Sequence, residues 1–390
     1  MRRKSILFLT NAYPDFDSSY RGIFVKKMAT LLLEEGYQVT IVTPKIYKKS
    51  HYSEEQEGIP IYRFPFFSGN KLLIEYEKIP YVRMMLYYIT GFFLTIFVML
   101  KHRCDLIHAH WAIPTGLLGV LTGVSLRKPL IVTIHGSDFR MAMKKSSLLK
   151  KCFIFVCKRA KTVNCVSEVM KKEIEQLGIQ GEKIITIPMG VDDHFLNTGR
   201  NRENNLNGKP ITILSNRNLQ PLYNVSLLIE AIPYVLKEES NVRFLIAGDG
   251  PERENLEGKI RDLNLDSSVQ FLGRIPHEKM PHLLGETALY VSTSLYDGTS
   301  VSLIEAMACG AFPIVTDIPS NREWIKDGEN GFLIPPNGET ILAQRIIEAI
   351  RNERVSKESL RRNLSIVEER ALWSKNIKKI KEVYCRHQIL

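Results

Sequence analysis

The chain alternates short apolar, β-branched runs with stretches of helical pattern along its whole length. The seven runs of the first half are KSILFLT, YQVTIVTP, IPIYRFP, CDLIHAH, KPLIVTIH, AKTVNCVS and EKIITIPMG. The six runs of the second half are PITILSN, VRFLIAGDG, VQFLG, ALYVSTS, AFPIVTD and GFLIPP. Continuous apolar runs separated by helices are typical of parallel strands that are covered on both faces. Two such series predict an α/β protein with two doubly wound domains.

A polar segment rich in Asn and Gly, residues 196–210, separates the two series and is expected to be a linker. A chain of 390 residues also exceeds the size that one core usually serves. We therefore expect an amino-terminal domain over residues 1–195 and a carboxy-terminal domain over residues 211–373. The last helix, residues 374–390, is expected to return to the first domain, with Trp373 packing it there.

Two features bear on where the protein works. The start, MRRKSILFLTNAYPD, has an apolar part, Ile6–Thr10, that is too short for a secretory signal and is expected to be the first β-strand. The six cysteines are scattered, with no CxxC and no His/Cys cluster at metal-ligand spacing. These cysteines favour a reducing compartment and no structural zinc site.

The net charge of +11 is unevenly distributed. Residues 1–195 hold 28 Lys and Arg against 17 Asp and Glu, residues 196–350 hold 14 against 20, and residues 351–390 hold 11 against 5. A basic surface attracts anionic partners such as nucleic acid or anionic lipid. No nucleic-acid reader motif is present, so nucleic acid is not expected as a partner.

Residues 84–100, MMLYYITGFFLTIFVML, form an uncharged apolar run of 17 residues. At ~1.5 Å per residue a helix of this length reaches roughly 25 Å, which is short of a ~30 Å hydrocarbon core. A buried or half-buried helix packed on the first sheet is therefore favoured over a helix that touches a membrane.

Residues 140–161 contain eight basic residues and no acid. Two interpretations explain this pattern equally well. One is an amphipathic helix that binds an anionic membrane surface, and the other is a helix with one solvated face beside a core face. The membrane interpretation places Phe153 and its apolar neighbours near the lipid headgroups. The lysines that would then face lipid are Lys144, Lys145, Lys150 and Lys151.

The stretch SLYDGTSVSLIEAMACG places two acids, Asp297 and Glu305, in an apolar neighbourhood. We expect a strand, a loop and then a helix that starts at Ser300 and ends at Gly310. Ligands of such sheets bind beyond the carboxyl ends of the strands, where a helix start offers N–H groups and Gly298 allows close approach. The two acids could accept hydrogen bonds from a diol such as that of a ribose or hexose. Alternatively, Asp297 caps the helix and Glu305 forms a buried ion pair.

The same stretch resembles the signature of the retaining family-4 glycosyltransferases, in which two acids separated by seven residues end in Glu-Ala-Met-Ala-x-Gly. The resemblance continues in the expected order through GIFVKKMATLLLEEGYQVTIVTP, DLIHAHWAIPTGLLG, PLIVTIHGSDF, VNCVSE, IPMGVD, AGDGPER, FLGRIPHEKM and GENGFLIPPNG. Any one of these blocks is weak evidence for the family, whereas the whole set in this order is specific to it. It implies the GT-B fold, in which two Rossmann-like domains face a cleft.

The resemblance also implies roles for residues of the second domain. Glu305 would hold the ribose of a nucleotide sugar, and Asp297 would hold the transferred sugar. Arg217 would bind the diphosphate, and the backbone of Arg274 and Ile275 would meet the base. The implied donor-binding residues are Arg217, Gly250, Arg274, Ile275, Gly298, Thr299, Ser300, Val301 and Glu305.

In the first domain, the resemblance places His135 against the donor sugar near the reacting carbon. The loop of Arg21 and Gly22 would close under the diphosphate and the acceptor. His110 suits a core position and an acceptor contact equally well, whereas His108 is favoured as a core residue. The implied catalytic residues are His135, Asp297 and Glu305.

The chain departs from the family at two positions. Tyr223 stands where members usually carry a lysine, six residues after the arginine, and Asp297 stands where glutamate is usual. Tyrosine can donate one hydrogen bond but carries no charge. Both departures bear on the donor sugar and not on the reaction class.

The resemblance therefore implies a retaining hexosyltransferase that moves a sugar from a nucleotide-diphosphate sugar to a glycan acceptor, which we expect to be lipid-linked. Its expected place is the cytoplasm, at the inner face of the plasma membrane, in cell-surface polysaccharide or glycolipid synthesis. No metal or other cofactor is expected, because Arg217 and the helix start can stabilise the leaving diphosphate. Two alternatives remain, a sugar-nucleotide epimerase on the same fold and a catalytically silent scaffold that binds sugar nucleotides.

Overall fold

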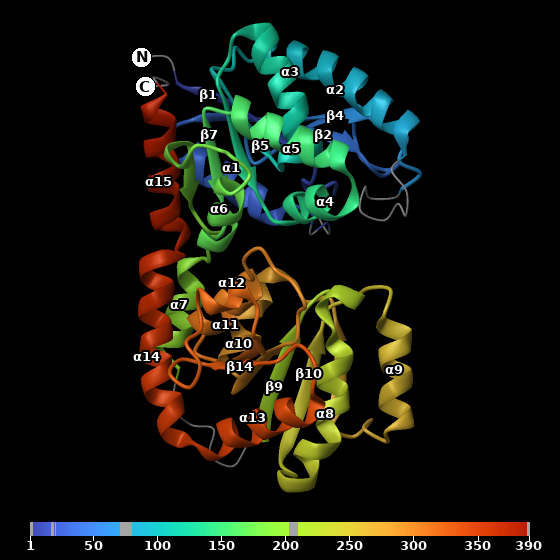
Figure 1. The fold of residues 1–390 in the computed structure, drawn as a ribbon, viewed down its shortest axis with the longest axis vertical. Coiled ribbons are helices and arrows are strands. Elements are labelled where there is room, and N and C mark those ends of the chain that lie inside the picture. Colours follow the sequence, from blue (N-terminus) through green and yellow to red (C-terminus); the bar gives the residue numbers. More distant parts are fainter. Residues whose placement is uncertain (1–2, 17–18, 20, 71–79, 203–209, 388–390) are drawn as a thin grey trace. The chain divides into compact units, whose positions relative to one another are not determined.

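A computed structural model of the chain describes residues 3–16, 19, 21–70, 80–202 and 210–387 (Figure 1). It divides into two compact units. Unit 1 comprises Met1–Pro188 and Ile377–Leu390, and unit 2 comprises Met189–Asn376. Each unit contains one largely parallel sheet with helices on its faces, which confirms the predicted α/β class and the two doubly wound domains.

Unit 1 is built on an eight-stranded sheet in the order β3-β4-β2-β1-β5-β6-β7-β8, in which only β3 and β4 pair antiparallel. The seven apolar runs of the first half are strands of this sheet, as predicted. Strand β3 was not predicted, because its sequence SEEQ is polar. The strands are β1 Ser5–Thr10, β2 Gln38–Lys45, β3 Ser53–Gln56, β4 Ile59–Pro65, β5 Leu106–His110, β6 Leu130–Ile134, β7 Thr162–Cys165 and β8 Ile184–Thr186.

The helices of unit 1 connect these strands and cover the sheet (Figure 1). They are α1 Ile23–Glu34, α2 Tyr81–Lys101, α3 Leu117–Leu126, α4 Ser137–Lys145, α5 Ser147–Arg159 and α6 Glu168–Glu175. The last helix, α15 Trp373–Arg386, belongs to unit 1 from residue 377 onward. There Tyr384 is fully buried and its hydroxyl lies 2.7 Å from Nδ1 of His108.

Helix α2 is half-buried on the sheet, which is the arrangement that the sequence favoured. Its inner face buries Tyr87, Gly91 and Thr95. A Cβ atom at Gly91 would lie 2.7 Å from Cδ2 of Leu118, so the glycine allows α2 to pack closely on α3. Within the described part of the chain, α2 is the one helix long and apolar enough to cross a membrane.

The basic segment 140–161 is not one continuous helix. It breaks at Ser146, whose hydroxyl accepts a hydrogen bond from the Leu148 N–H and caps α5. Phe153 is fully buried and packs on Phe139, with ring centroids 5.6 Å apart, so its predicted place near lipid headgroups is wrong. The side chain of Lys145 lies outside the described part of the structure.

Unit 2 is built on a six-stranded parallel sheet in the order β11-β10-β9-β12-β13-β14. The six apolar runs of the second half are its strands, as predicted. They are β9 Ile211–Asn216, β10 Val242–Ala247, β11 Val269–Gly273, β12 Leu289–Ser292, β13 Phe312–Thr316 and β14 Phe332–Ile334. The helices are α7 Asp193–Arg200, α8 Val225–Glu238, α9 Arg253–Asp262, α10 Met280–Gly285, α11 Val301–Ala308, α12 Pro319–Arg322, α13 Glu339–Arg351 and α14 Glu353–Arg370.

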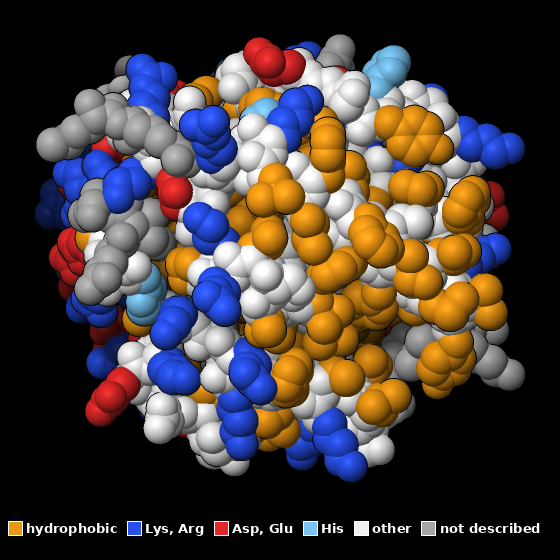
Figure 2. All heavy atoms as spheres, turned by 90° about the horizontal axis from the view of Figure 1, so that it is seen from above, with side chains coloured by type: hydrophobic (Ala, Val, Ile, Leu, Met, Phe, Trp, Pro, Cys, Tyr) orange, Lys and Arg blue, Asp and Glu red, His pale blue; other side chains and the backbone are white. Residues whose placement is uncertain are grey.

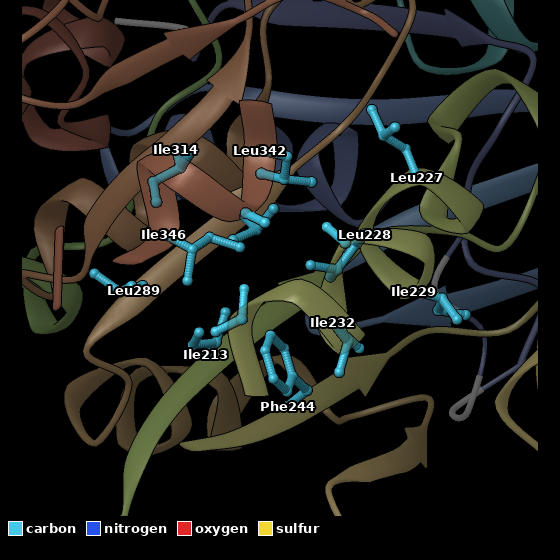
Figure 3. Packing of buried hydrophobic residues seen from close by; sticks show 14 of the residues in the cluster. Ile213, Leu227, Leu228, Ile229, Ile232, Phe244, Leu289, Ile314, Leu342 and Ile346 are labelled. Atoms are coloured by element: carbon cyan, nitrogen blue, oxygen red, sulfur yellow. The ribbon is translucent and has the colours of Figure 1, made fainter. Parts of the chain in front are cut away.

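One face of this sheet is covered by α8 and α13 (Figure 3). Leu228 and Ile232 of α8 and Ile346 of α13 point toward Ile213 and Phe244 of the strands, and all five are at most 1% exposed. Burying each such side chain contributes roughly 1.5–3 kcal/mol. This core supports the sheet, and the candidate site is built from the edge of that sheet.

The predicted linker, residues 196–210, is wrong at its start. Residues 193–200 form α7, and Phe195 and Leu196 belong to the hydrophobic core of unit 2. Residues 203–209 lie outside the described part of the chain. Trp373 also belongs to unit 2, not to the first domain, because its indole packs on Gly190, where a Cβ atom would lie 2.4 Å from Cδ2.

Candidate functional site

Four loops meet at the carboxyl edge of the sheet in unit 2. They follow β9, β10, β11 and β12, and the last of them leads into α11. This is the edge at which doubly wound sheets bind ligands. Every residue predicted to bind the donor lies in one of these loops or in α11: Arg217 after β9, Gly250 after β10, Arg274 and Ile275 after β11, and Gly298, Thr299, Ser300, Val301 and Glu305 after β12.

The structure brings three of these residues into direct contact. Arg217 donates from Nη1 to the hydroxyl of Ser300 over 2.8 Å, and from Nη2 to Oδ2 of Asp297 over 2.6 Å. All three are largely buried. Burial raises the pKa of the Asp297 carboxyl above its ordinary value, and Arg217 partly offsets this shift. The guanidinium and the start of α11 therefore lie side by side at the ligand-binding edge.

Helix α11 begins where the sequence predicts. The hydroxyl of Ser300 caps it by accepting from the Leu303 N–H over 3.3 Å. The alternative in which Asp297 caps the helix is wrong, because its carboxylate pairs with Arg217 instead. The first N–H groups of a helix have no partner inside it, and their partial positive charge adds to that of Arg217. The start of α11 therefore suits an anion.

Glu305 lies one to two turns into α11 and has a partner that the sequence did not reveal. Its Oε1 lies 2.8 Å from Nε2 of His277, which belongs to the FLGRIPHEKM block. The structure therefore offers a partner, His277, for the predicted alternative in which Glu305 forms a buried ion pair. Glu305 is 6% exposed and His277 is half-exposed, so the pair borders the surface of unit 2.

Tyr223 lies against Arg217 in the position where the family usually carries lysine. The guanidinium carbon is 4.2 Å from the centre of the tyrosine ring, which is a cation–π contact. The ring therefore supports the orientation of Arg217 without adding charge.

Two glycines hold the loop after β10 against the loop after β9. Gly248 has φ of +134°, and a Cβ atom there would lie 2.1 Å from the carbonyl oxygen of Arg217. A Cβ atom at Gly250 would lie 2.3 Å from the carbonyl oxygen of Leu219. Gly250 thus has a packing role beside Arg217. The guanidinium of Arg274, in the next loop, approaches Oδ2 of Asp249 at 3.7 Å.

Unit 1 contains a row of three stacked imidazoles at the ends of β5 and β6. The ring centroids of His108 and His110 are 4.7 Å apart, and those of His110 and His135 are 5.3 Å apart. His108 is a core residue, as the sequence favoured, because its two ring nitrogens bond to Tyr384 and Thr133. His110 is fully buried and stacks on His135, and its contact with an acceptor stays a prediction.

The environment of His135 keeps its ring neutral. Burial, with a smaller contribution from His108, lowers its pKa to about 3. Its Nε2 lies 3.1 Å from Nδ1 of His110, whose other nitrogen is buried without a partner. An unpaired acceptor is less costly than an unpaired N–H, which favours a proton on Nδ1 of His110 and hence on Nδ1 of His135. Half-buried between Trp111 and Phe24, His135 can in this tautomer donate one hydrogen bond from Nδ1.

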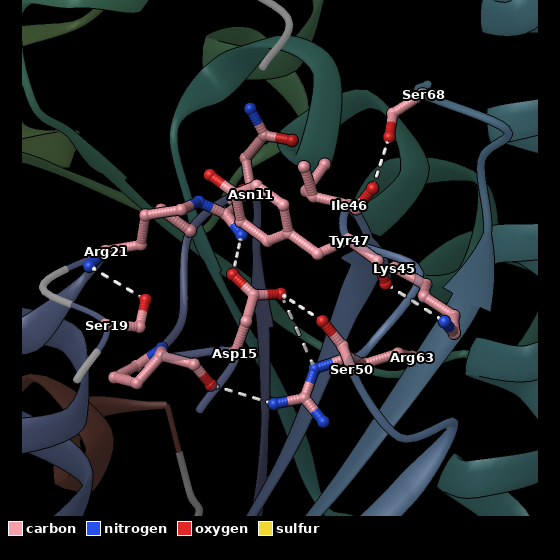
Figure 4. A network of polar contacts seen from close by, with 12 residues as sticks. Asn11, Asp15, Ser19, Arg21, Lys45, Ile46, Tyr47, Ser50, Arg63 and Ser68 are labelled. Atoms are coloured by element: carbon pink, nitrogen blue, oxygen red, sulfur yellow. Dashed lines mark hydrogen bonds and ion pairs between the residues drawn. The ribbon is translucent and has the colours of Figure 1, made fainter. Parts of the chain in front are cut away.

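The predicted acceptor loop is fixed by a buried ionic network (Figure 4). Gly22 has φ of +63°, and a Cβ atom there would lie 2.1 Å from the carbonyl oxygen of Ala12. Arg21 forms an ion pair with Asp15 and donates to the Asn11 carbonyl over 2.8 Å. Asp15 was not predicted as a site residue, although an acid after Pro14, in the loop that follows β1, was a signal for it.

Arg63 of β4 is the second cation of this network. Its Nη2 donates to the Pro14 carbonyl over 2.8 Å and forms an ion pair with Oε1 of Glu54 over 2.7 Å. It is 1% exposed, and its Nε lies 3.9 Å from Oδ1 of Asp15. The side chain of Arg21 is therefore held inside unit 1, two residues before α1 begins.

Among the residues that the structure describes, no group of three or more His, Cys, Asp or Glu side chains is placed to hold a metal ion. Within unit 2, the predicted residues that come together are Arg217, Asp297 and Ser300, with Glu305 one to two turns farther along α11. Within unit 1 they are His110 and His135, whereas Arg21 lies in the separate network of Asp15.

Comparison with known proteins gives two adjoining family matches. A family model described as Glycosyltransferase Family 4 matches residues 22–195, and one described as Glycosyl transferases group 1 matches residues 199–379. These are the families that the motif order suggests.

Individual relatives are more distant. The alpha-monoglucosyldiacylglycerol synthase of Streptococcus pneumoniae is 25% identical over 84% of this chain and 74% of that protein. The UDP-Gal:alpha-D-GlcNAc-diphosphoundecaprenol alpha-1,3-galactosyltransferase of Escherichia coli is 30% identical over 61% of this chain and 64% of that protein. The solved sucrose-phosphate synthase of Thermosynechococcus elongatus superposes with a TM-score of 0.79 at 18% identity, covering 98% of this chain and 99% of that one.

Proposed function

Since the chain belongs to the family-4 glycosyltransferases and has their GT-B fold, we propose that it transfers a hexose from a nucleotide-diphosphate sugar to a glycan acceptor. The observation that carries this proposal is the contact between Arg217 and the start of α11. A guanidinium beside a helix start offers positive charge and N–H donors to the leaving diphosphate.

In the proposed reaction, the bond between the anomeric carbon and the diphosphate oxygen breaks, and an acceptor hydroxyl bonds to that carbon from the same face. The hydroxyl proton passes to the departing diphosphate. Because the hydroxyl attacks from the face that the diphosphate leaves, the configuration at the anomeric carbon is retained. Arg217 and the backbone of residues 299–301 stabilise the charge that grows on the diphosphate. Neither step requires a metal ion.

The remaining predicted residues hold the donor in this proposal. Glu305 accepts hydrogen bonds from the ribose hydroxyls, and the backbone of Arg274 and Ile275 meets the base. Asp297 and the neutral ring of His135 bond to hydroxyls of the transferred sugar. Support for these roles comes from the shared loop edge of unit 2 and from the half-buried place of His135 in unit 1.

We further propose that the acceptor is lipid-linked and that the protein acts as a peripheral protein at the inner face of the plasma membrane. The support lies in the names of two relatives, one a monoglucosyldiacylglycerol synthase and the other a galactosyltransferase named for a diphosphoundecaprenol-linked sugar. Cell-surface polysaccharide or glycolipid synthesis fits both acceptor types.

A thermal-shift panel of nucleotide sugars tests the donor assignment. One base and sugar combination is expected to raise the melting temperature more than the others, because binding only the folded state stabilises it. Slow hydrolysis of that donor then separates an enzyme from a silent scaffold. Binding without any hydrolysis or transfer would favour the scaffold, and conversion of the donor into another sugar nucleotide would favour the epimerase.

The Glu305→Gln variant is expected to fold normally but to bind the donor about 10- to 100-fold more weakly. A charge-assisted hydrogen bond to a hydroxyl contributes roughly 1.5–3 kcal/mol, which corresponds to this loss. Isothermal calorimetry with the donor from the panel measures the change. The Glu278→Gln variant, at an exposed position beside His277, is the matched control and is expected to change nothing. Unchanged affinity in Glu305→Gln would contradict its assignment to the ribose.

The two variants of Tyr223 are expected to differ. Tyr223→Phe keeps the ring over Arg217 and should leave donor binding and turnover within about twofold of the parent. Tyr223→Ala removes a cation–π contact worth about 0.5–2 kcal/mol and should weaken donor binding about 2- to 30-fold. If Tyr223→Phe proves as damaging as Arg217→Ala, the phenol hydroxyl has replaced part of the lysine usual at this position.

A further inference from the structure

The outer face of α2 is an exposed apolar surface. Its exposed side chains recur every three or four residues, which is the spacing of one face of a helix. Phe93, near the middle, is 67% exposed. Helix α3 packs beside α2 and adds two more exposed apolar side chains. We call this surface the apolar face, and it comprises Val82, Met85, Ile89, Phe93, Phe97, Leu100, Leu121 and Val124.

Figure 2 shows unit 1 from the side of α2 and α3, where hydrophobic side chains form a broad continuous area. Apolar side chains that are scattered singly are normal on the surface of a monomeric protein. Continuous exposed apolar patches are rare there and usually mark a binding surface. Lys and Arg side chains border the area in the same view, and few acids do.

The segment that contains the apolar face is rich in positive charge. Residues 81–161 contain thirteen Lys and Arg but only two acids, Asp105 and Asp138. Asp138 is 1% exposed, and Asp105 lies 4.0 Å from Lys128. The basic rim at the carboxyl ends of α2 and α3 comprises Lys101, Arg103, Arg127 and Lys128.

Helix α2 cannot leave unit 1 without breaking specific contacts. The hydroxyl of Thr90 donates to the Pro65 carbonyl over 2.8 Å, and Lys101 donates from Nζ to the hydroxyl of Tyr62 over 2.9 Å. Its inner face is buried around Gly91. The exposed face is therefore presented to a partner by a fixed helix, as in a protein that lies on a membrane, and not by a helix that spans one.

We propose that the apolar face docks onto an anionic lipid membrane. The apolar side chains enter the boundary between headgroups and acyl chains, to a depth of about 5–10 Å, and the basic rim lies among the lipid phosphates. A second copy of the chain is the less suitable occupant, because a symmetric pair would bring two basic rims together. Docking through this face would bring the protein to the membrane that holds the proposed lipid-linked acceptor. Apart from that acceptor, membrane docking does not depend on the proposed function.

Vesicle flotation tests this proposal with the full chain and no donor. The parent is expected to bind vesicles of phosphatidylcholine with phosphatidylglycerol more tightly than pure phosphatidylcholine vesicles, and less tightly as salt rises. The triple variant Ile89→Ser, Phe93→Ser, Phe97→Ser should require at least tenfold more lipid for half-maximal binding. The matched control removes three similarly exposed apolar side chains of unit 2, in Tyr234→Ser, Leu263→Ser, Ile341→Ser, and should bind like the parent.

A second variant tests the basic rim alone. Lys101→Gln, Arg127→Gln, Lys128→Gln should lose the preference for anionic vesicles while keeping the apolar face. Equal vesicle binding by the parent and the triple serine variant would overturn the proposal, as would a parent that binds neither type of vesicle. So would a parent dimer that fails to bind vesicles and that the triple serine variant splits, because the face would then join two copies.

Vesicle binding tests the membrane surface, and donor hydrolysis tests the proposed sugar transfer. The triple serine variant is expected to hydrolyse a water-soluble donor at the parent's rate, because its substitutions lie outside the donor-binding loops. Vesicle binding without donor hydrolysis in the parent would count against sugar transfer alone. Donor hydrolysis without vesicle binding would count against the membrane surface and the peripheral location, but not against sugar transfer.

Discussion

The Arg217→Ala variant is expected to lower turnover of the nucleotide sugar by about 10²–10³-fold. The loss follows from removing the guanidinium that contacts Ser300 at the start of α11, where charge is proposed to grow on the leaving diphosphate. Affinity for the free nucleoside diphosphate should fall about 10- to 100-fold, because a charged hydrogen bond contributes roughly 1.5–3 kcal/mol. Steady-state kinetics and calorimetry measure the two losses.

Stability has to be separated from function in this variant. Removing Arg217 leaves Asp297 buried without its partner, which costs about 3–5 kcal/mol. The double variant Arg217→Gln, Asp297→Asn removes both charges and should recover much of that stability without recovering turnover. Arg243 is an exposed cation near the opposite end of the strands, and Arg243→Ala is the matched control, which should change neither turnover nor stability. Full turnover in the double variant would contradict the role of Arg217.

The His135→Ala variant is expected to lower turnover by about 10²-fold while changing nucleoside diphosphate affinity less than about twofold. The difference arises because His135 lies in unit 1, whereas the residues proposed to bind the nucleotide lie in unit 2. A positioned hydrogen-bonding group at a reaction centre contributes about 10²-fold or more to the rate.

The control for this variant is His51→Ala, an exposed histidine of unit 1, which should keep full turnover. The melting temperature of each variant is measured in parallel, because His135 stacks on His110 and packs between Trp111 and Phe24. Equal losses of turnover and nucleotide affinity would identify His135 as a structural residue.

Much of the fold could be predicted because parallel strands carry a strong local signal. Each of the thirteen apolar runs is a strand, since strands covered on both faces need continuous apolar sequence. Strand β3 escaped prediction because backbone pairing with β4 forms it, not its polar side chains. The break at Ser146 was missed because both flanking helices continue the same basic pattern.

The candidate site was less predictable wherever its contacts join distant residues. The sequence located the loops of Arg217 and Asp297, but the ion pair between them joins positions eighty residues apart. The partner of Glu305, His277, and the pair of Asp15 with Arg63 depend on the folded sheet in the same way. The HxH spacing in β5 was a usable signal for the stacked histidines, because alternate residues of a strand share a face.

The most direct test of the account is release of nucleoside diphosphate from a panel of nucleotide sugars, with lipid extract present as a source of acceptors. The account predicts that one donor is consumed with formation of a glycosylated product of retained configuration, and that Arg217→Ala suppresses this release by about 10²-fold or more. Tight binding of a nucleotide sugar with no release and no product from any donor would contradict it.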